Sequence, residues 1–126
     1  YGVAIYDEHH SAIKLFGKRL GIKTNNEAEY AGVVAALEKI KELYGSLHAR
    51  QMDVEVRMDS ELVCKQLNGV YRVKKEHLKP FVFAIWNLKL DFGSIRFVHV
   101  PSEKNKEADR MVNAALDGHK SASDDV

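Results

Sequence analysis

Residues 53 to 67 read DVEVRMDSELVCKQL and decide the fold. Apolar and polar side chains alternate as far as Met58, a pattern that predicts a strand with one buried face. Asp59 and Ser60 follow, and Ser60 is placed to cap a short helix that ends at Leu67. A strand that leads directly into a helix predicts an α/β unit with Asp59 at its junction.

A long helix is predicted upstream of this unit. Thr24 and Glu27 fit a capping box in which Thr24 is the N-cap. Apolar residues then recur at helical spacing as far as Tyr44, and Gly45 is suited to end the helix. Glu29 falls in the first turn, where it borders the apolar stripe.

The remaining segments complete a layered fold. Residues 1–6 and 11–18 predict two strands of a hairpin, residues 78–92 a second long helix, and residues 94–100 a last strand. A final helix is predicted from Asn105, its cap, to just before Gly118. We therefore expect an α/β fold with a mixed sheet, in which an antiparallel hairpin joins parallel strands and helices flank the sheet.

Composition predicts one globular domain, which we place at residues 1–118, followed by a polar tail at 119–126. The chain has 126 residues, of which 45% are hydrophobic and 29% charged. No apolar run reaches the roughly 18 residues that a membrane span needs. The single cysteine, Cys64, cannot form an internal disulfide, so we expect a cytoplasmic protein without membrane association. The formal charge of +1 neither favours nor excludes a nucleic-acid partner.

Three acids lie at the ends of predicted elements: Glu29, Asp59 and Asp109. Each has a structural explanation by itself, because acids stabilise the first turn of a helix and can start one. If the three ends meet at one edge of the sheet, however, three carboxylates share a small volume and require a cation. Oxygen ligands suit a hard ion such as Mg²⁺, with substrate phosphate and water completing its shell.

Several of these segments resemble type 1 ribonuclease H. Residues 24–30 (TNNEAEY), 58–63 (MDSELV) and 105–109 (NKEAD) resemble the three segments that carry its catalytic acids, in the family's order. Residues 66–75 (QLNGVYRVKK) resemble the compact branch that lacks the basic protrusion. The resemblance covers residues 1–118 and implies the ribonuclease H-like fold.

The resemblance implies an endonuclease that cuts the RNA strand of RNA–DNA hybrids by two-metal-ion hydrolysis and leaves a 3′-hydroxyl and a 5′-phosphate. Glu29, Asp59 and Asp109 would bind the metal, which we expect to be Mg²⁺, with Mn²⁺ as the alternative. His99 is the nearest candidate for the family's histidine that aids product release, and we place it among the catalytic residues. A histidine inside a strand also has a purely structural interpretation.

The resemblance also implies a nucleic-acid interface. Thr24, Asn25 and Asn26 would contact the hybrid, the asparagines in its minor groove. A second stretch is rich in basic residues that either grip backbone phosphates or form a solvated face. Its members are Lys65, Arg72, Lys74, Lys75, Lys79 and Lys89. We select Lys65, Arg72 and Lys74 as hybrid-binding residues and expect Trp86, which lies among apolar neighbours, to belong to the core.

The chain departs from the family at two places. The family's first strand, which is central in the sheet and ends in an aspartate, would precede Tyr1. Its absence removes a metal ligand and leaves two strands without a neighbour, so we interpret the chain as a fragment. The alternatives are that a partner chain supplies the strand, or that the protein is inactive; otherwise we expect a monomer. The lesser departure is Glu61, where some members carry a glutamine.

Three functions remain open at this point. The leading one is the hybrid-specific endonuclease, and the second is a catalytically silent module of the same fold that binds hybrid or duplex RNA. The third is another nuclease or a strand-transfer enzyme of the superfamily, which the Thr24-Asn25-Asn26 cap disfavours. A purely structural protein would not need three acids at element ends.

Overall fold

The computed structural model describes residues 2–6, 12–17, 25–101 and 111–117. The opening strands are β1 (Gly2–Tyr6) and β2 (Ala12–Gly17), followed by α1 (Asn25–Tyr44) and the short α2 (Ser46–Ala49). Next come β3 (Asp53–Met58), α3 (Glu61–Leu67), a 3₁₀ turn η1 (Glu76–Leu78) and α4 (Lys79–Lys89). The last strands are β4 (Ser94–His99) and β5 (Met111–Asp117). Apart from α2, η1 and β5, these elements follow the predicted segments closely.

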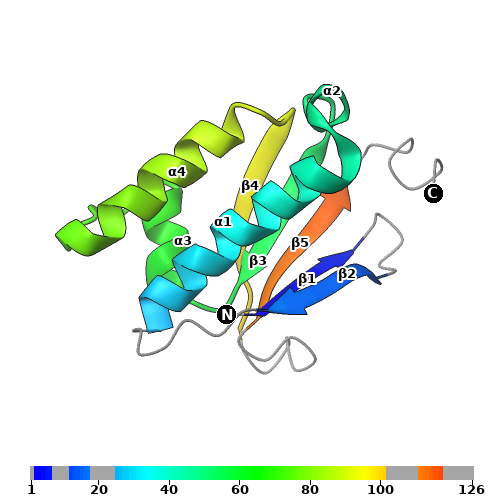
Figure 1. The fold of residues 1–126 in the computed structure, drawn as a ribbon. Coiled ribbons are helices and arrows are strands. Elements are labelled where there is room, and N and C mark those ends of the chain that lie inside the picture. The colour runs from blue at the N-terminus through cyan, green and yellow to red at the C-terminus, as the bar shows by residue number, and fades with distance from the viewer. Residues whose placement is uncertain (1, 7–11, 18–24, 102–110, 118–126) are drawn as a thin grey trace.

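The strands form one mixed sheet in the order β2-β1-β5-β3-β4 (Figure 1). β1 and β2 are antiparallel, and β3 and β4 are parallel, with Met58 opposite His99 at the carboxyl ends. β5 lies between β1 and β3, parallel to the first and antiparallel to the second. The predicted class, an α/β fold with a mixed sheet, is confirmed.

β5 corrects the predicted last helix, because residues 111–117 form a strand. The periodicity of this segment is helical, but its backbone pairs on both sides: Ala114 lies opposite Ile5 of β1 and Val56 of β3. Without β5, the facing edges of β1 and β3 would leave their N–H and C=O groups unpaired, a cost that exceeds a preference for helix. The expectation that two strands lack a neighbour is therefore also wrong.

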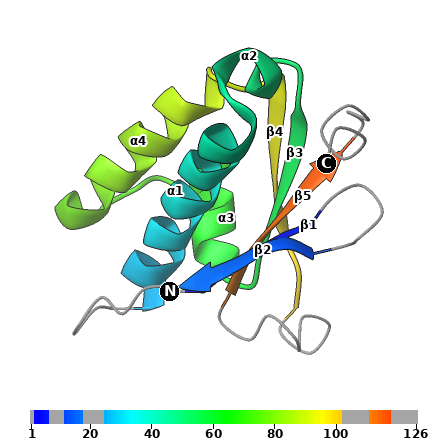
Figure 2. The ribbon, with the colours of Figure 1, turned by 45° about the vertical axis from the view of Figure 1, so that its right-hand side comes forward.

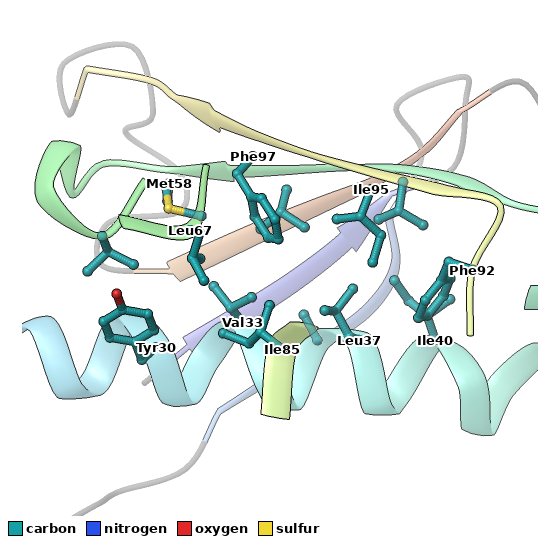
Figure 3. Packing of buried hydrophobic residues seen from close by; sticks show 14 of the residues in the cluster. Tyr30, Val33, Leu37, Ile40, Met58, Leu67, Ile85, Phe92, Ile95 and Phe97 are labelled. Atoms are coloured by element: carbon teal, nitrogen blue, oxygen red, sulfur yellow. The ribbon is translucent and has the colours of Figure 1, made fainter. Parts of the chain in front are cut away.

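The helices gather on one side of the sheet (Figure 2). Apolar side chains of the helices and the sheet form one buried cluster between them. In β3 the buried residues alternate with half-buried ones, as the sequence predicted. Figure 3 shows side chains of α1 pointing at those of the sheet, with Ile85 of α4 and Leu67 of α3 closing the core. Those of α1 are Tyr30, Val33, Leu37 and Ile40, all fully buried. This packing fixes α1 across the sheet and so positions its first turn.

Local signals set the ends of the helices. Gly45 ends α1 at a φ of 84°, in the left-handed region that favours glycine. Ser60 caps α3, since its Oγ accepts the Val63 N–H at 3.2 Å. Among the described residues, no helix is both long and apolar enough to cross a membrane.

The prediction that Trp86 belongs to the core is wrong: its side chain is 45% exposed. Val82 and Ile85 occupy the inward face of α4, so Trp86 lies at the border of the buried stripe. It packs edge-on against Phe83, with the ring centroids 6.4 Å apart.

Candidate active site

Three element ends converge beside the carboxyl end of β3: the first turn of α1, the junction after Met58 and the cap of α3. The Ser60 N–H donates a hydrogen bond to Glu29 Oε2 at 3.3 Å. The Ser60 hydroxyl donates to Asn26 Oδ1 at 3.4 Å. The residues Glu29 and Asp59, far apart in sequence, therefore share one site, as their positions at element ends predicted.

The sequence places both carboxylates at the border between core and solvent. Glu29 precedes the fully buried Tyr30 and is itself only 7% exposed. Asp59 follows Met58, the last buried residue of β3, and is half-buried. A strand end next to the start of a helix is where α/β folds bind their ligands.

The two acids interact electrostatically. The pKa of Glu29 is raised from 4.5 to about 7, chiefly by burial and next by the negative charge of Asp59. The backbone N–H of Ser60 acts in the opposite direction by stabilising the ionised form. Burial and mutual repulsion therefore disfavour the state in which both carboxylates are ionised. A bound cation would stabilise that state.

The donor set fits a hard divalent cation, because it consists of two carboxylates on separate elements. Within the described residues, no group of three His, Cys, Asp or Glu side chains gathers at one point. Asp109 lies outside the described residues, as does Thr24. The structure thus brings together two of the three predicted acids, and the third remains a prediction.

His99 lies at the same edge of the sheet. It is the last residue of β4, is exposed, and pairs with Met58, the neighbour of Asp59. The Val100 N–H donates to the Met58 carbonyl at 2.8 Å, which holds the end of β4 against the end of β3. The position is near the acid pair, and the proposed role in product release stays a prediction.

A groove of about 440 Å³ begins at Asn26 and continues along the segment after α3. Arg72, Lys74 and Lys75 line it and form no ion pair with other described residues. Lys65, by contrast, pairs with Glu61 at 3.3 Å and lies over the Tyr71 ring. Of the three basic residues selected from the sequence, Arg72 and Lys74 therefore have no ion-pair partner among the described residues, whereas Lys65 is paired with Glu61.

Sequence reasoning missed a buried link between the site and this groove. The Tyr30 hydroxyl donates to Gln66 Oε1 at 2.6 Å, and Gln66 Nε2 donates to the Arg72 carbonyl at 3.3 Å. Gln66 is only 6% exposed. The sequence offers one signal for the burial of Gln66, which is that this polar residue is the neighbour of Leu67 on the apolar face of α3. The link fixes the basic segment relative to the helix that carries Glu29.

A mixed sheet covered by helices on its apolar side, with one buried and one half-buried acid at a strand end, is the arrangement of a ribonuclease H-like domain. A family model described as reverse transcriptase-like matches residues 1–115. The chain belongs to this family.

Solved structures agree with this assignment. LC11-RNase H1 in complex with an RNA/DNA hybrid is 39% identical, with a TM-score of 0.75 over 84% of this chain and 76% of the other. RNase H1 from the archaeon Halobacterium salinarum is 30% identical, with a TM-score of 0.69 over 93% of this chain and 79% of the other.

Two sequence relatives show how much of a longer protein the chain matches. It is 33% identical over 118 residues to a bifunctional protein of Mycobacterium tuberculosis, covering 93% of this chain and 31% of the relative. It is 36% identical over 101 residues to ribonuclease HI of Halobacterium salinarum, covering 80% of this chain and 48% of the relative. The chain therefore spans at most about half of these relatives.

Proposed function

We propose that this chain is a ribonuclease H domain that cleaves the RNA strand of RNA–DNA hybrids. The observation that carries the proposal is the shared, largely buried site of Glu29 and Asp59, with Asn26 joining it to a basic groove. The similarity to LC11-RNase H1, whose structure contains an RNA/DNA hybrid, supports the same substrate.

The reaction is hydrolysis of a phosphodiester. The oxygen of a water molecule bonds to phosphorus, the bond from phosphorus to the 3′-oxygen breaks, and the products are a 3′-hydroxyl and a 5′-phosphate. Glu29 and Asp59, together with Asp109, would hold Mg²⁺ or Mn²⁺. Bound divalent cations supply an activated water and stabilise the leaving oxygen.

The residues of the chain position the substrate and the acids. The Ser60 N–H holds the Glu29 carboxylate, and the Ser60 hydroxyl holds the Asn26 amide oxygen. Thr24, Asn25 and Asn26 would contact the minor groove of the hybrid, where 2′-hydroxyls distinguish RNA from DNA. Arg72 and Lys74, lining the groove, would neutralise backbone phosphates. His99, at the adjoining strand end, would aid departure of the cleaved product.

We also propose the setting in which this activity operates. Residues 1–118 would form the domain, with 119–126 as a polar tail. The lone cysteine, Cys64, is buried and free, in keeping with a reducing, cytoplasmic location. The domain would act as a monomer, because β5 already pairs with both β1 and β3 and occupies the place that a partner's strand would take.

The test is cleavage of a hybrid whose RNA strand is labelled, with Mg²⁺ added, and with single-stranded RNA and duplex DNA as substrate controls. We expect Asp59→Asn to abolish cleavage while the free energy of unfolding stays nearly unchanged, because the amide keeps the shape and loses the charge. Asp53→Asn is the matched control: Asp53 lies at the other end of β3, where it accepts the Ser94 hydroxyl at 2.7 Å. Full activity of Asp59→Asn, or equal loss in both variants, would contradict the assignment.

The second candidate is a catalytically silent module that binds hybrid or duplex RNA. It is favoured by the basic groove that begins at Asn26, because Arg72 and Lys74 would hold backbone phosphates whether or not the acid pair binds a cation. The same assay separates the two functions, since a silent module retains the hybrid in a binding measurement and produces no fragments with either Mg²⁺ or Mn²⁺.

A further inference from the structure

A second pocket, of about 300 Å³, lies between the segment after α3 and the outer side of α4. It shares Gln66, Tyr71 and Arg72 with the basic groove, so the two hollows adjoin each other. The rest of its lining includes Lys79, Phe83 and Trp86. The proposed hybrid contacts at Arg72 and Lys74 do not account for this part of the surface.

Three aromatic side chains of this pocket are unusually exposed. Phe83 is 61% exposed, Trp86 45% and Tyr71 44%. Phe83 and Trp86 are three residues apart on α4 and meet edge to face, at an interplanar angle of 85°. This arrangement leaves ring surface open to the pocket, and large exposed aromatics in a hollow mark a binding site.

The charged side chains that line the pocket, within the described part of the chain, are basic. Arg72 and Lys79 line it, and no acidic residue is among the described residues that do so. Lys79 pairs with Glu76 at 2.8 Å, but the Glu76 side chain is 85% exposed. An ion pair that is this exposed to solvent is weak. The pocket therefore suits a ligand that is anionic and has flat apolar faces. A single-stranded nucleic acid has both properties.

We infer that this pocket binds an unpaired, single-stranded segment that continues from the hybrid, with bases stacked on Phe83 and Trp86 and phosphates beside Arg72 and Lys79. The inference rests on the proposed function in one respect, namely that the single-stranded segment continues from a bound hybrid. The adjoining basic groove and the absence of acids in the described lining favour nucleic acid over a protein partner.

Trp86 makes the binding directly measurable, because it is the only tryptophan of the 126 residues. The chain is titrated with a ten-nucleotide oligothymidylate while its intrinsic tryptophan fluorescence is recorded. We expect the emission to be quenched as a base stacks on the indole. Lys79→Gln should weaken this binding. Its affinity should also fall less steeply with added salt than that of the parent chain, because one phosphate contact is lost. Leu90→Ala is the matched control, since Leu90 is 81% exposed on the turn after α4 and lies outside the pocket.

A second measurement compares two hybrids by fluorescence anisotropy in metal-free buffer, one with blunt ends and one with a single-stranded DNA extension. We expect Phe83→Ala to lower affinity for the extended hybrid about tenfold, as for the loss of one stacked base, and to leave the blunt hybrid unaffected. Equal affinity of parent and Phe83→Ala for the extended hybrid would overturn the inference.

Two further outcomes would also overturn it. One is unchanged Trp86 emission on addition of the oligonucleotide. The other is an emission change that follows protein concentration alone, which would assign the surface to a second copy of the chain. Quenching by the single strand without any hybrid cleavage would refute the proposed function and leave this pocket assignment standing.

Discussion

Glu29 makes the stability of the chain depend on pH in a direction that can be predicted. Its pKa is raised from 4.5 to about 7 by burial and by Asp59, so the folded chain binds this proton more tightly than the unfolded chain. The stabilisation is fully present below pH 4.5 and is lost as the pH rises through 7. The loss amounts to at most about 3 kcal/mol in the free energy of unfolding.

Glu29→Gln should remove this dependence. In metal-free buffer, urea unfolding should show the variant more stable than the parent at pH 8, with little difference at pH 4. Glu38→Gln, on the exposed side of the same helix, is the control and should keep the parent's pH profile. A parent-like loss of stability in Glu29→Gln between these pH values would show that another group is responsible.

At the scale of elements, local signals predicted most of the structure. The Ser60 cap, the Gly45 stop and the alternation of β3 act through neighbours in sequence, so they could be read directly. β5 could not, because its conformation depends on backbone pairing with β1 and β3, which are remote in sequence. The buried contact of Tyr30 with Gln66 was missed for the same reason, since 36 residues separate the two.

The central position of β5 gives a testable difference between strands. Ala114→Pro should lower the free energy of unfolding by about 3 kcal/mol or more, because proline removes a ladder hydrogen bond from a strand paired on both sides. Leu15→Pro, in the edge strand β2, should cost less, since β2 has a neighbour on one side only. Chemical unfolding of both variants measures this, and an equal or reversed order would argue against the position of β5.

For the molecule as a whole, the distribution of charge favours one surface for the proposed nucleic-acid contacts. Among the side chains of β3 and β4 that alternate with the buried ones, Arg57 and Arg96 are paired with Glu55, at 2.6 Å and 3.2 Å. These contacts lower the pKa of Glu55. The groove at Asn26 instead offers Arg72 and Lys74 without ion pairs among the described residues. A net charge of only +1 therefore conceals a local basic surface beside the acid pair.

Salt dependence should report on that surface. Arg72→Ala and Lys74→Ala should each weaken hybrid binding and reduce the slope of log affinity against log salt by about 1, since each side chain would neutralise one phosphate in the proposed interface. Lys89→Ala, at the end of α4 and outside both hollows, should leave the slope unchanged. Anisotropy titrations at several salt concentrations measure the three slopes. An effect of Lys89 equal to that of Arg72 would indicate diffuse attraction and not a groove.

The central claim is that Glu29 and Asp59 together bind the divalent cation on which cleavage depends. Its most direct test is an NMR titration of the Glu29 carboxyl carbon, with and without Mg²⁺, in the parent chain and in Asp59→Asn. We predict a pKa of about 7 without metal and a marked fall when Mg²⁺ is present, because a bound cation favours the ionised form. Asp59→Asn should lower the metal-free pKa and weaken the response to Mg²⁺. A Glu29 pKa that Mg²⁺ leaves unchanged in the parent chain would contradict the account.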